Sequence, residues 1–195
     1  MTLWARARRI WLLPVALFAW TLLLVLVRDD VAKVPQIAAQ GTFSIKLMNF
    51  VPLILCIPTM YCMSRRLTAT ETTAARAVTA VDRLTLLLLG VSTAGLGFAL
   101  GDFLDMPTAV AGGRNTVMVL GLALLVRSRY GPIAGGAAAT MFVMVSIVTG
   151  LAGDQRPYPW AVLLTESTSV VAAVVAAVSF TAGLITMSYH RQIPG

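Results

Sequence analysis

The stretch Leu84–Leu104 reads LTLLLLGVSTAGLGFALGDFL and carries no charge before Asp102. A helix of this length spans about 30 Å, the thickness of the hydrocarbon core of a bilayer. Similar apolar runs recur between short polar segments, at 10–27, 43–63, 108–126, 132–151 and 160–187. The sequence therefore predicts an all-α, polytopic membrane protein, with six transmembrane helices in a single transmembrane domain over residues 1–195.

The composition agrees with a chain that has lipid as its solvent. Hydrophobic residues make up 58% of the 195 residues and charged residues only 12%, whereas soluble domains carry about 25% charged residues. The longest polar segment, 64–83, is too short for a nucleotide-binding or nucleic-acid-binding domain. We therefore expect a non-enzymatic chain in the lipid bilayer, without a bound metal or cofactor and without a nucleic-acid partner.

The basic residues predict the orientation, because cytosolic loops carry an excess of Lys and Arg. With the N-terminus inside, the cytosolic segments hold ten of the 15 basic residues. These ten are Arg6, Arg8, Arg9, Arg65, Arg66, Arg76, Arg83, Arg127, Arg129 and Arg191. Both termini are thus predicted to be cytosolic, in a multi-pass protein of the plasma (inner) membrane.

Small residues at helical spacing predict close contacts between helices, because they let two backbones approach. They occur in the third, fifth and sixth predicted spans, as Gly90, Gly97, Gly101, Gly131, Gly135, Ala172, Ala176 and Gly183. We expect these residues to pack within the bundle or against another subunit. The alternative is a chance pattern in a chain rich in Ala and Gly.

The longest polar segment has the pattern of a helix start. Thr68 is followed three residues later by Glu71, a capping-box spacing, and no Gly or Pro occurs from Ala69 to Asp82. A short helix over 68–82, lying along the cytosolic interface, is therefore predicted. It offers a contact surface to a cytosolic partner; the alternative is an inert connector.

Two polar residues fall inside the predicted sixth span. Glu166 and Ser169 follow the start of this apolar run by a few residues. An ionisable residue within a membrane is costly and is often functional. We treat the pair as a possible intramembrane polar site that binds a cation, accepts a proton or pairs with an arginine; the alternative places Glu166 at the outer interface.

Charged residues also flank the predicted outer hairpin between the third and fourth spans. Asp102 and Asp105 lie on one helix face, and Arg114 opens the fourth apolar run. Either the fourth helix starts near Thr108 and carries Arg114 into the membrane, or this span is short or broken. We expect Arg114 to form an ion pair with one of the two aspartates and so to pin the hairpin.

Two groups of residues resemble a known family. They are SRRLTATE (64–71) with VDR (81–83), and GRN (113–115) with GLALL (121–125). Together with six short spans, they resemble the compact permease subunit of the type-two ABC exporter class of actinobacterial operons. The N-terminal segment and the loop 152–159 are shorter than is usual in that class.

The resemblance implies an exporter of a small hydrophobic or peptide-like compound. The helix over 68–82 would be its coupling helix, which presents Thr68, Glu71, Arg76, Asp82 and Arg83 to a cytosolic ATPase subunit. ATP and Mg would bind in that partner, and a second permease copy or paralogue would complete the transporter. Glu71→Ala or Arg76→Glu is then expected to lower the coupling to ATP hydrolysis without unfolding the bundle.

Two alternatives remain at this point. The turn Tyr130–Gly136 is faintly similar to substrate-capture subunits of energy-coupling-factor vitamin importers, which also have six spans. The other alternative is a non-transporting accessory membrane protein. A retained small molecule favours the first alternative, and a co-purified ATPase favours the exporter.

Overall fold

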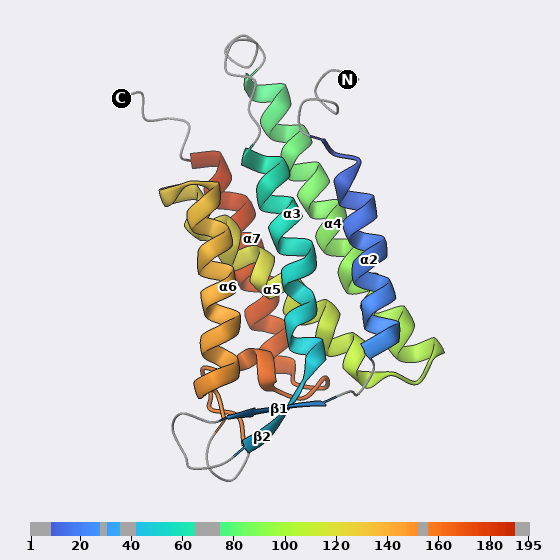
Figure 1. Cartoon of the computed structure of the whole chain (residues 1–195). Helices are drawn as coiled ribbons and strands as arrows, with labels where there is room; N and C mark the ends of the chain where they lie inside the picture. Colours follow the sequence, from blue (N-terminus) through green and yellow to red (C-terminus); the bar gives the residue numbers. More distant parts are fainter. Residues whose placement is uncertain (1–8, 28–30, 36–41, 65–74, 152–155, 190–195) are drawn as a thin grey trace.

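Six α-helices form an up-and-down bundle in the computed structural model, which describes residues 9–27, 31–35, 42–64, 75–151 and 156–189. Successive helices run in opposite directions, so α2, α4 and α6 begin at the same end (Figure 1). The helices are α2 (Leu12–Val27), α3 (Val51–Ser64), α4 (Ala75–Phe103), α5 (Pro107–Tyr130), α6 (Pro132–Thr149) and α7 (Val170–Tyr189). The predicted polytopic α-helical fold is confirmed.

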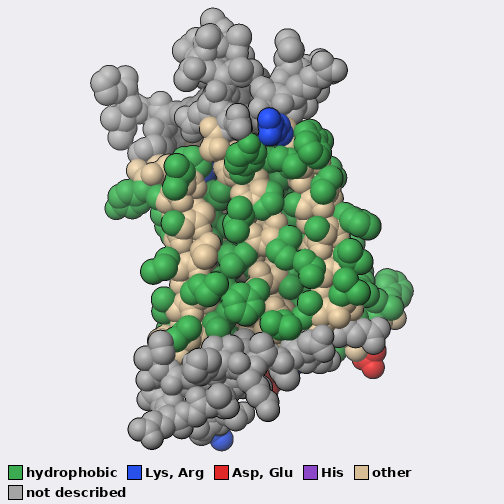
Figure 2. All heavy atoms as spheres, viewed as in Figure 1, with side chains coloured by type: hydrophobic (Ala, Val, Ile, Leu, Met, Phe, Trp, Pro, Cys, Tyr) green, Lys and Arg blue, Asp and Glu red, His purple; other side chains and the backbone are tan. Residues whose placement is uncertain are grey.

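The lateral surface of the bundle is apolar. Five helical segments are long and apolar enough to cross a membrane, with α3 counted together with the short 3-10 helix η1 (Leu47–Phe50) before it. The helix α2 is also apolar but shorter. Figure 2 shows hydrophobic side chains covering the face of the bundle between its two ends. This surface matches a lipid environment, in which helices satisfy their own backbone hydrogen bonds.

The helix α5 is the centre of the bundle. Within the stretch of α5 that is long enough to cross a membrane, about 67% is buried inside the protein, against 22% for α7 and 28% for α4 and α6. Its first residue is Pro107, and the missing N–H of proline costs nothing there, because the first amides of a helix have no intrahelical acceptor. The helix then continues unbroken to Tyr130, for 24 residues in all. The fourth span is therefore complete, and it carries Arg114 into the bundle.

Glycine contacts explain how α4 lies close to α5. A Cβ placed on Gly97 would come within 2.8 Å of the Ala109 carbonyl oxygen and 3.0 Å of Gly113 Cα. A Cβ on Gly101 would collide with the Val110 side chain. The prediction that these small residues are packing positions is confirmed.

The contact between α5 and α7 is equally close. A Cβ on Gly121 would lie 2.5 Å from the backbone nitrogen of Phe180, and one on Gly183 would lie 2.8 Å from the Gly121 carbonyl oxygen. Gly90 of α4 packs against the Phe180 ring from the other side. The predicted small residues Ala172, Ala176 and Gly183 are all buried. The seam in the last helix therefore packs within the bundle.

The two glycines at the start of α6 have different roles. A Cβ on Gly135 would approach the Ala123 carbonyl oxygen to 2.6 Å, so Gly135 is a packing residue. Gly131 has a φ of +91° and no atom within 4 Å of an added Cβ. Its N–H donates to the Arg127 carbonyl oxygen and ends α5. The prediction of a packing role for Gly131 is wrong, because the left-handed turn requires a glycine there.

A β-hairpin precedes the second helix. The strands β1 (Val31–Pro35) and β2 (Thr42–Lys46) are antiparallel, with Val31 opposite Lys46. The predicted span over 43–63 therefore begins too early, and α3 starts only at Val51. Figure 1 places the hairpin at the end of the bundle where α2 finishes. We call this end the hairpin end.

The predicted helix over 68–82 is wrong as a separate element. Residues 75–82 form the first turns of α4, which continues to Phe103 without a break. Thr68 and Glu71 lie outside the described residues. Because neither Gly nor Pro occurs between Ala75 and Leu89, nothing in the sequence interrupts the helix at residue 82.

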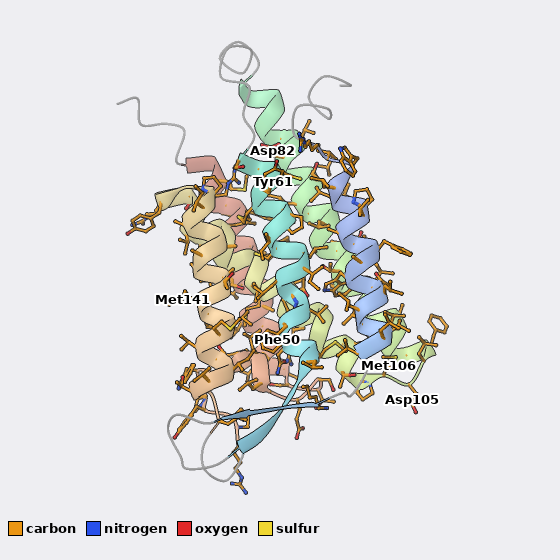
Figure 3. All side chains as sticks on the ribbon, viewed as in Figure 1. Phe50, Tyr61, Asp82, Asp105, Met106 and Met141 are labelled. Atoms are coloured by element: carbon orange, nitrogen blue, oxygen red, sulfur yellow. The ribbon has the colours of Figure 1, made fainter. Side chains whose placement is uncertain are left out.

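The charged residues differ between the two ends of the bundle. The end where α2, α4 and α6 begin, which we call the arginine end, carries Arg9, Arg83, Arg127 and Arg129. The hairpin end carries Lys46 and Arg156 together with Asp102, Asp105 and Glu166. In Figure 3, Asp82 and Tyr61 mark the arginine end, and Asp105 and Met106 lie near the opposite one.

Candidate functional site

Arg114 connects α5 to the segment before α7. Its side chain is only 9% exposed. Nη1 donates to the Glu166 carbonyl oxygen at 2.7 Å, and Nη2 donates to the Thr165 carbonyl oxygen at 3.0 Å. Guanidinium hydrogen bonds of this kind are among the strong ones because the donor is charged. The segment is therefore fixed to the centre of the bundle.

Asn115 completes this anchor. Its Nδ2 donates to the Leu163 carbonyl oxygen at 2.8 Å, while its Oδ1 accepts from Arg114 Nε at 3.3 Å and Nη2 at 3.2 Å. Both side chains are buried. We call Arg114 and Asn115 the outer anchor: it satisfies three backbone carbonyls of an irregular segment that would otherwise lose hydrogen bonds in the membrane.

The predicted ion pair of the outer hairpin is wrong. Asp102 and Asp105 are both exposed, and Arg114 donates to Asn115, Thr165 and Glu166 instead. Asp105 lies at the turn between α4 and α5, at the edge of the molecule (Figure 3). Arg114 lies two turns into α5 on the face that packs inward, so the aspartates remain in solvent.

The predicted intramembrane polar site is also wrong in its placement. The last helix begins at Val170, so Glu166 lies in the irregular segment before it, and its side chain is exposed. Ser169 is the residue before α7, and its Oγ accepts from the Ala172 N–H at 3.3 Å. Serine is common at the position before a helix because its side-chain oxygen accepts a hydrogen bond from an amide that the first turn leaves unpaired.

A cavity of about 270 Å³ opens beside the outer anchor. Its walls come from η1, the first turns of α5 and the anchored segment. Lys46, Asn49, Thr108, Glu166 and Thr168 are polar residues that line it. Met48, Pro107, Ala111 and Leu163 supply apolar wall. Thr165 and Ser167 also line it, so seven of its eleven lining residues are polar, and its volume lies just below the range of about 300–1,000 Å³ that is usual for small-molecule sites.

Thr108 is the unusual residue of this cavity. Its side chain is 6% exposed, and its Oγ1 has no hydrogen-bond partner among the described residues. A buried hydroxyl without a partner costs about 1–3 kcal/mol. The residue before α5, Met106, provides no side-chain cap, so the first turn of α5 also lacks a side-chain acceptor.

A second hollow adjoins the first cavity. It has a volume of about 400 Å³ and shares Pro107, Ser167 and Thr168 with the first cavity. Asp102 and Asp105 line it, which makes it acidic. Among the described residues, no group of three or more His, Cys, Asp or Glu side chains is placed to hold a metal ion.

At the arginine end, the structure shows a buried cation that the sequence reasoning treated only as an orientation signal. Arg127 is 9% exposed, and its Nη2 donates to the Met63 carbonyl oxygen at 3.4 Å. Nη1 also contacts Met187 Sδ at 3.9 Å. Arg127 therefore joins the ends of α3, α5 and α7.

The predicted coupling residues differ in their accessibility. Asp82 is only 4% exposed, so its carboxylate is not presented to a partner, and Arg83 is half-buried. Arg76 lies in the first turn of α4. Of the described coupling residues, Asp82 is thus better explained as part of the bundle.

The sequence reasoning missed Asn115, Thr108 and Lys46 as site residues. The signal was present for Asn115, because an Arg-Asn pair in an otherwise apolar helix predicts a buried polar contact. Compared with protein-family models, with curated proteins and with solved structures, the chain matches none. The geometry of these residues is therefore the basis for assigning a function.

Proposed function

We propose that this chain is the membrane-spanning permease subunit of an ABC transporter that exports a small hydrophobic or peptide-like compound. A separate ATPase subunit binds ATP and Mg and supplies the energy. A second permease copy or a paralogue completes the transporter in the plasma membrane. The length of α4 is the observation that carries this proposal.

The helix α4 is longer than a membrane crossing requires. It has 29 residues, whereas about 20 residues span a 30 Å hydrocarbon core. If the core begins at Asp102, which is exposed at the hairpin end, it ends near Asp82. The first turns of α4, from Ala75 to Val81, then extend about 10 Å beyond the core.

The charge distribution supports a cytosolic position for this extension. It belongs to the arginine end, where Arg83, Arg127 and Arg129 also lie, and such residues favour the cytosolic side. A helix that continues rigidly from the cytosol into the bundle can transmit movement of a bound subunit. In this proposal, the ATPase contacts residues 75–81, with Arg76 as the main charge.

Arg76→Glu in the tagged full-length chain tests this contact. In this proposal Arg76 faces an acidic surface of the ATPase, so the variant places like charges across the interface and weakens association strongly; co-purified ATP hydrolysis from the native membrane should fall about tenfold. Arg156→Glu, an exposed change at the hairpin end, is the matched control and should retain it. Equal hydrolysis in both variants, or a wild-type chain that purifies without an ATPase, would overturn the proposal.

A second candidate is a substrate-capture subunit of an energy-coupling-factor importer. The cavity beside the outer anchor favours it, because such a subunit binds its substrate without an ATPase. The two candidates separate on purification. A vitamin retained by the isolated chain in detergent supports substrate capture, and an ATPase contact through residues 75–81 supports the exporter.

A further inference from the structure

A groove lies on the lateral surface of the bundle between α3 and α6, which are side by side (Figure 1). Its volume is about 370 Å³, and α6 lines it from Pro132 to Thr140. At about 1.5 Å per residue, this stretch of α6 is about 12 Å long, whereas one leaflet of the hydrocarbon core is about 15 Å deep. The groove therefore starts at the arginine end and extends through most of one leaflet.

The walls of the groove are apolar. Two of its hydroxyl groups are bonded within their own helices: Ser64 Oγ donates to the Tyr61 carbonyl oxygen at 2.7 Å, and Thr140 Oγ1 donates to the Gly136 carbonyl oxygen at 3.0 Å. Apart from Tyr61, the other side chains that line the groove are apolar: those of Ile57, Met60, Pro132, Ile133 and Ala137. These walls favour a hydrocarbon chain over a polar ligand.

Gly136 keeps the groove open. A Cβ on this residue would lie 4.0 Å from Met60 Cβ and Cγ, at the outer limit of van der Waals contact. Its neighbour Gly135 differs, because a Cβ there would come within 2.6 Å of the Ala123 carbonyl oxygen. A larger side chain at Gly136 would therefore fill the groove without a collision of its Cβ with the bundle.

Arg9 places a positive charge at the mouth of the groove. Its Nη1 donates to Tyr61 Oη at 3.4 Å, and its carbonyl oxygen accepts from the Cys62 thiol at 3.7 Å, so Arg9 is held at the end of α3. Tyr61 lines the groove and lies at the arginine end (Figure 3). Among the described residues, those that line the groove include no acidic side chain. The exposed guanidinium of Arg9 is therefore accessible to an anion.

The mouth of the groove lies at the expected level of the lipid headgroups. Tyr61 and Tyr130 are exposed at the arginine end, and exposed tyrosines are typical of the membrane–water interface. A ligand with a hydrocarbon chain and an anionic group at this level is an anionic phospholipid, which basic residues near a membrane surface attract. A second copy of the chain in the same orientation fits less well, because it would bring a second arginine end beside Arg9.

We propose that the groove between α3 and α6 binds an anionic phospholipid, with one acyl chain in the groove and the phosphate at Arg9. The site is independent of the proposed ATPase contact, which uses residues 75–81 of α4. Its failure would therefore leave the proposed function untouched.

Native mass spectrometry of the purified full-length chain, titrated in detergent with phosphatidylglycerol or phosphatidylcholine, tests the groove. The wild type should bind the first phosphatidylglycerol molecule saturably and more tightly than phosphatidylcholine. Gly136→Leu should abolish this saturable binding, because the new side chain occupies the groove. The matched control is Gly95→Leu, which adds the same side chain on the exposed face of α4, where a Cβ has no atom within 4 Å. It should bind as the wild type does.

Arg9→Gln tests the charge separately from the groove. It should weaken the binding of phosphatidylglycerol about fivefold, the effect of one basic residue near a membrane surface. Binding of phosphatidylcholine should stay the same. Arg156→Gln removes an exposed charge at the hairpin end and should change the binding of neither lipid.

Three results would overturn the proposal. They are equal affinity of the wild type for the two lipids, equal binding of phosphatidylglycerol by Gly136→Leu and Gly95→Leu, and an unchanged preference for phosphatidylglycerol in Arg9→Gln. The third result decides even if Gly136→Leu does not fold. A dimer of the wild type that Gly136→Leu disrupts while it still binds phosphatidylglycerol would assign the groove to a second copy instead.

Discussion

At the scale of single residues, the outer anchor depends on the shape of the guanidinium group as well as on its charge. Arg114 makes hydrogen bonds from three of its nitrogens at once. A lysine has one nitrogen and cannot reproduce this fork. The anchor therefore predicts that a conservative substitution at this position is not tolerated.

Arg114→Lys should lower the thermal midpoint of the chain in detergent almost as much as Arg114→Met does. Each leaves buried carbonyls without donors, at a cost of about 1–3 kcal/mol for each group. Tryptophan fluorescence on heating measures the midpoint. A Lys variant as stable as the wild type would show that charge alone maintains the segment.

The aspartates of the outer hairpin provide the complementary test. Asp102→Asn and Asp105→Asn should leave the thermal midpoint unchanged, because both carboxylates are exposed. The charge swap of Arg114→Asp with Asp105→Arg should not rescue stability. Rescue of stability by this double variant would support the ion pair that the sequence predicts and would contradict the contacts described for Arg114.

At the scale of helices, two glycines of similar sequence context differ in their surroundings. Gly121 lies against the backbone of α7, whereas a Cβ on Gly95 of α4 would have no atom within 4 Å. Gly121→Ala should therefore destabilise the bundle by about 1–3 kcal/mol through overpacking.

Gly95→Ala, in contrast, should stabilise α4 by up to about 1 kcal/mol, because alanine has a higher helix propensity than glycine. Thermal midpoints of the two variants would decide, and similar losses in both would contradict the packing described for α5 and α7.

Hydropathy predicts the helices well where apolar content and helix coincide. Leu84–Leu104, for example, lies almost entirely in α4. It fails over Phe43–Lys46 and Trp160–Ser169, because a strand and an irregular segment can be as apolar as a helix. In the second case, Ser169 was the available signal, since serine often precedes a helix.

The candidate site was only partly predictable. The sequence draws attention to Arg114 and Glu166, because charges are costly near lipid. It pairs Arg114 with an aspartate of the outer hairpin, whereas the structure pairs it with two main-chain oxygens and with the side chains of Asn115 and Thr165. Backbone partners depend on the path of the chain, which residue types do not reveal. Thr108 and Lys46 line the same cavity because the hairpin and η1 bring residues 46–50 beside α5. The apolar pattern of the sequence did not predict either of these two elements.

At the scale of the whole molecule, the two ends of the bundle should be accessible from opposite sides of the membrane. Asp105 and Arg129 are exposed at the hairpin end and the arginine end, respectively. With a membrane-impermeant maleimide on intact cells, Asp105→Cys should react and Arg129→Cys should react only after lysis. The native Cys56 and Cys62 are buried and should contribute little background. Reaction of Arg129→Cys on intact cells would reverse the orientation.

The outer anchor has a consequence for how this surface can vary. It recognises the carbonyls of Leu163, Thr165 and Glu166, which every amino acid possesses. The side chain at position 166 is thus free to change while the path of the chain stays the same, whereas Thr165 adds a side-chain contact, since its Oγ1 also accepts from Arg114 Nη2 at 3.3 Å. A common scaffold with this anchor can present different chemistry to the exterior, much as an antibody framework supports diverse loops.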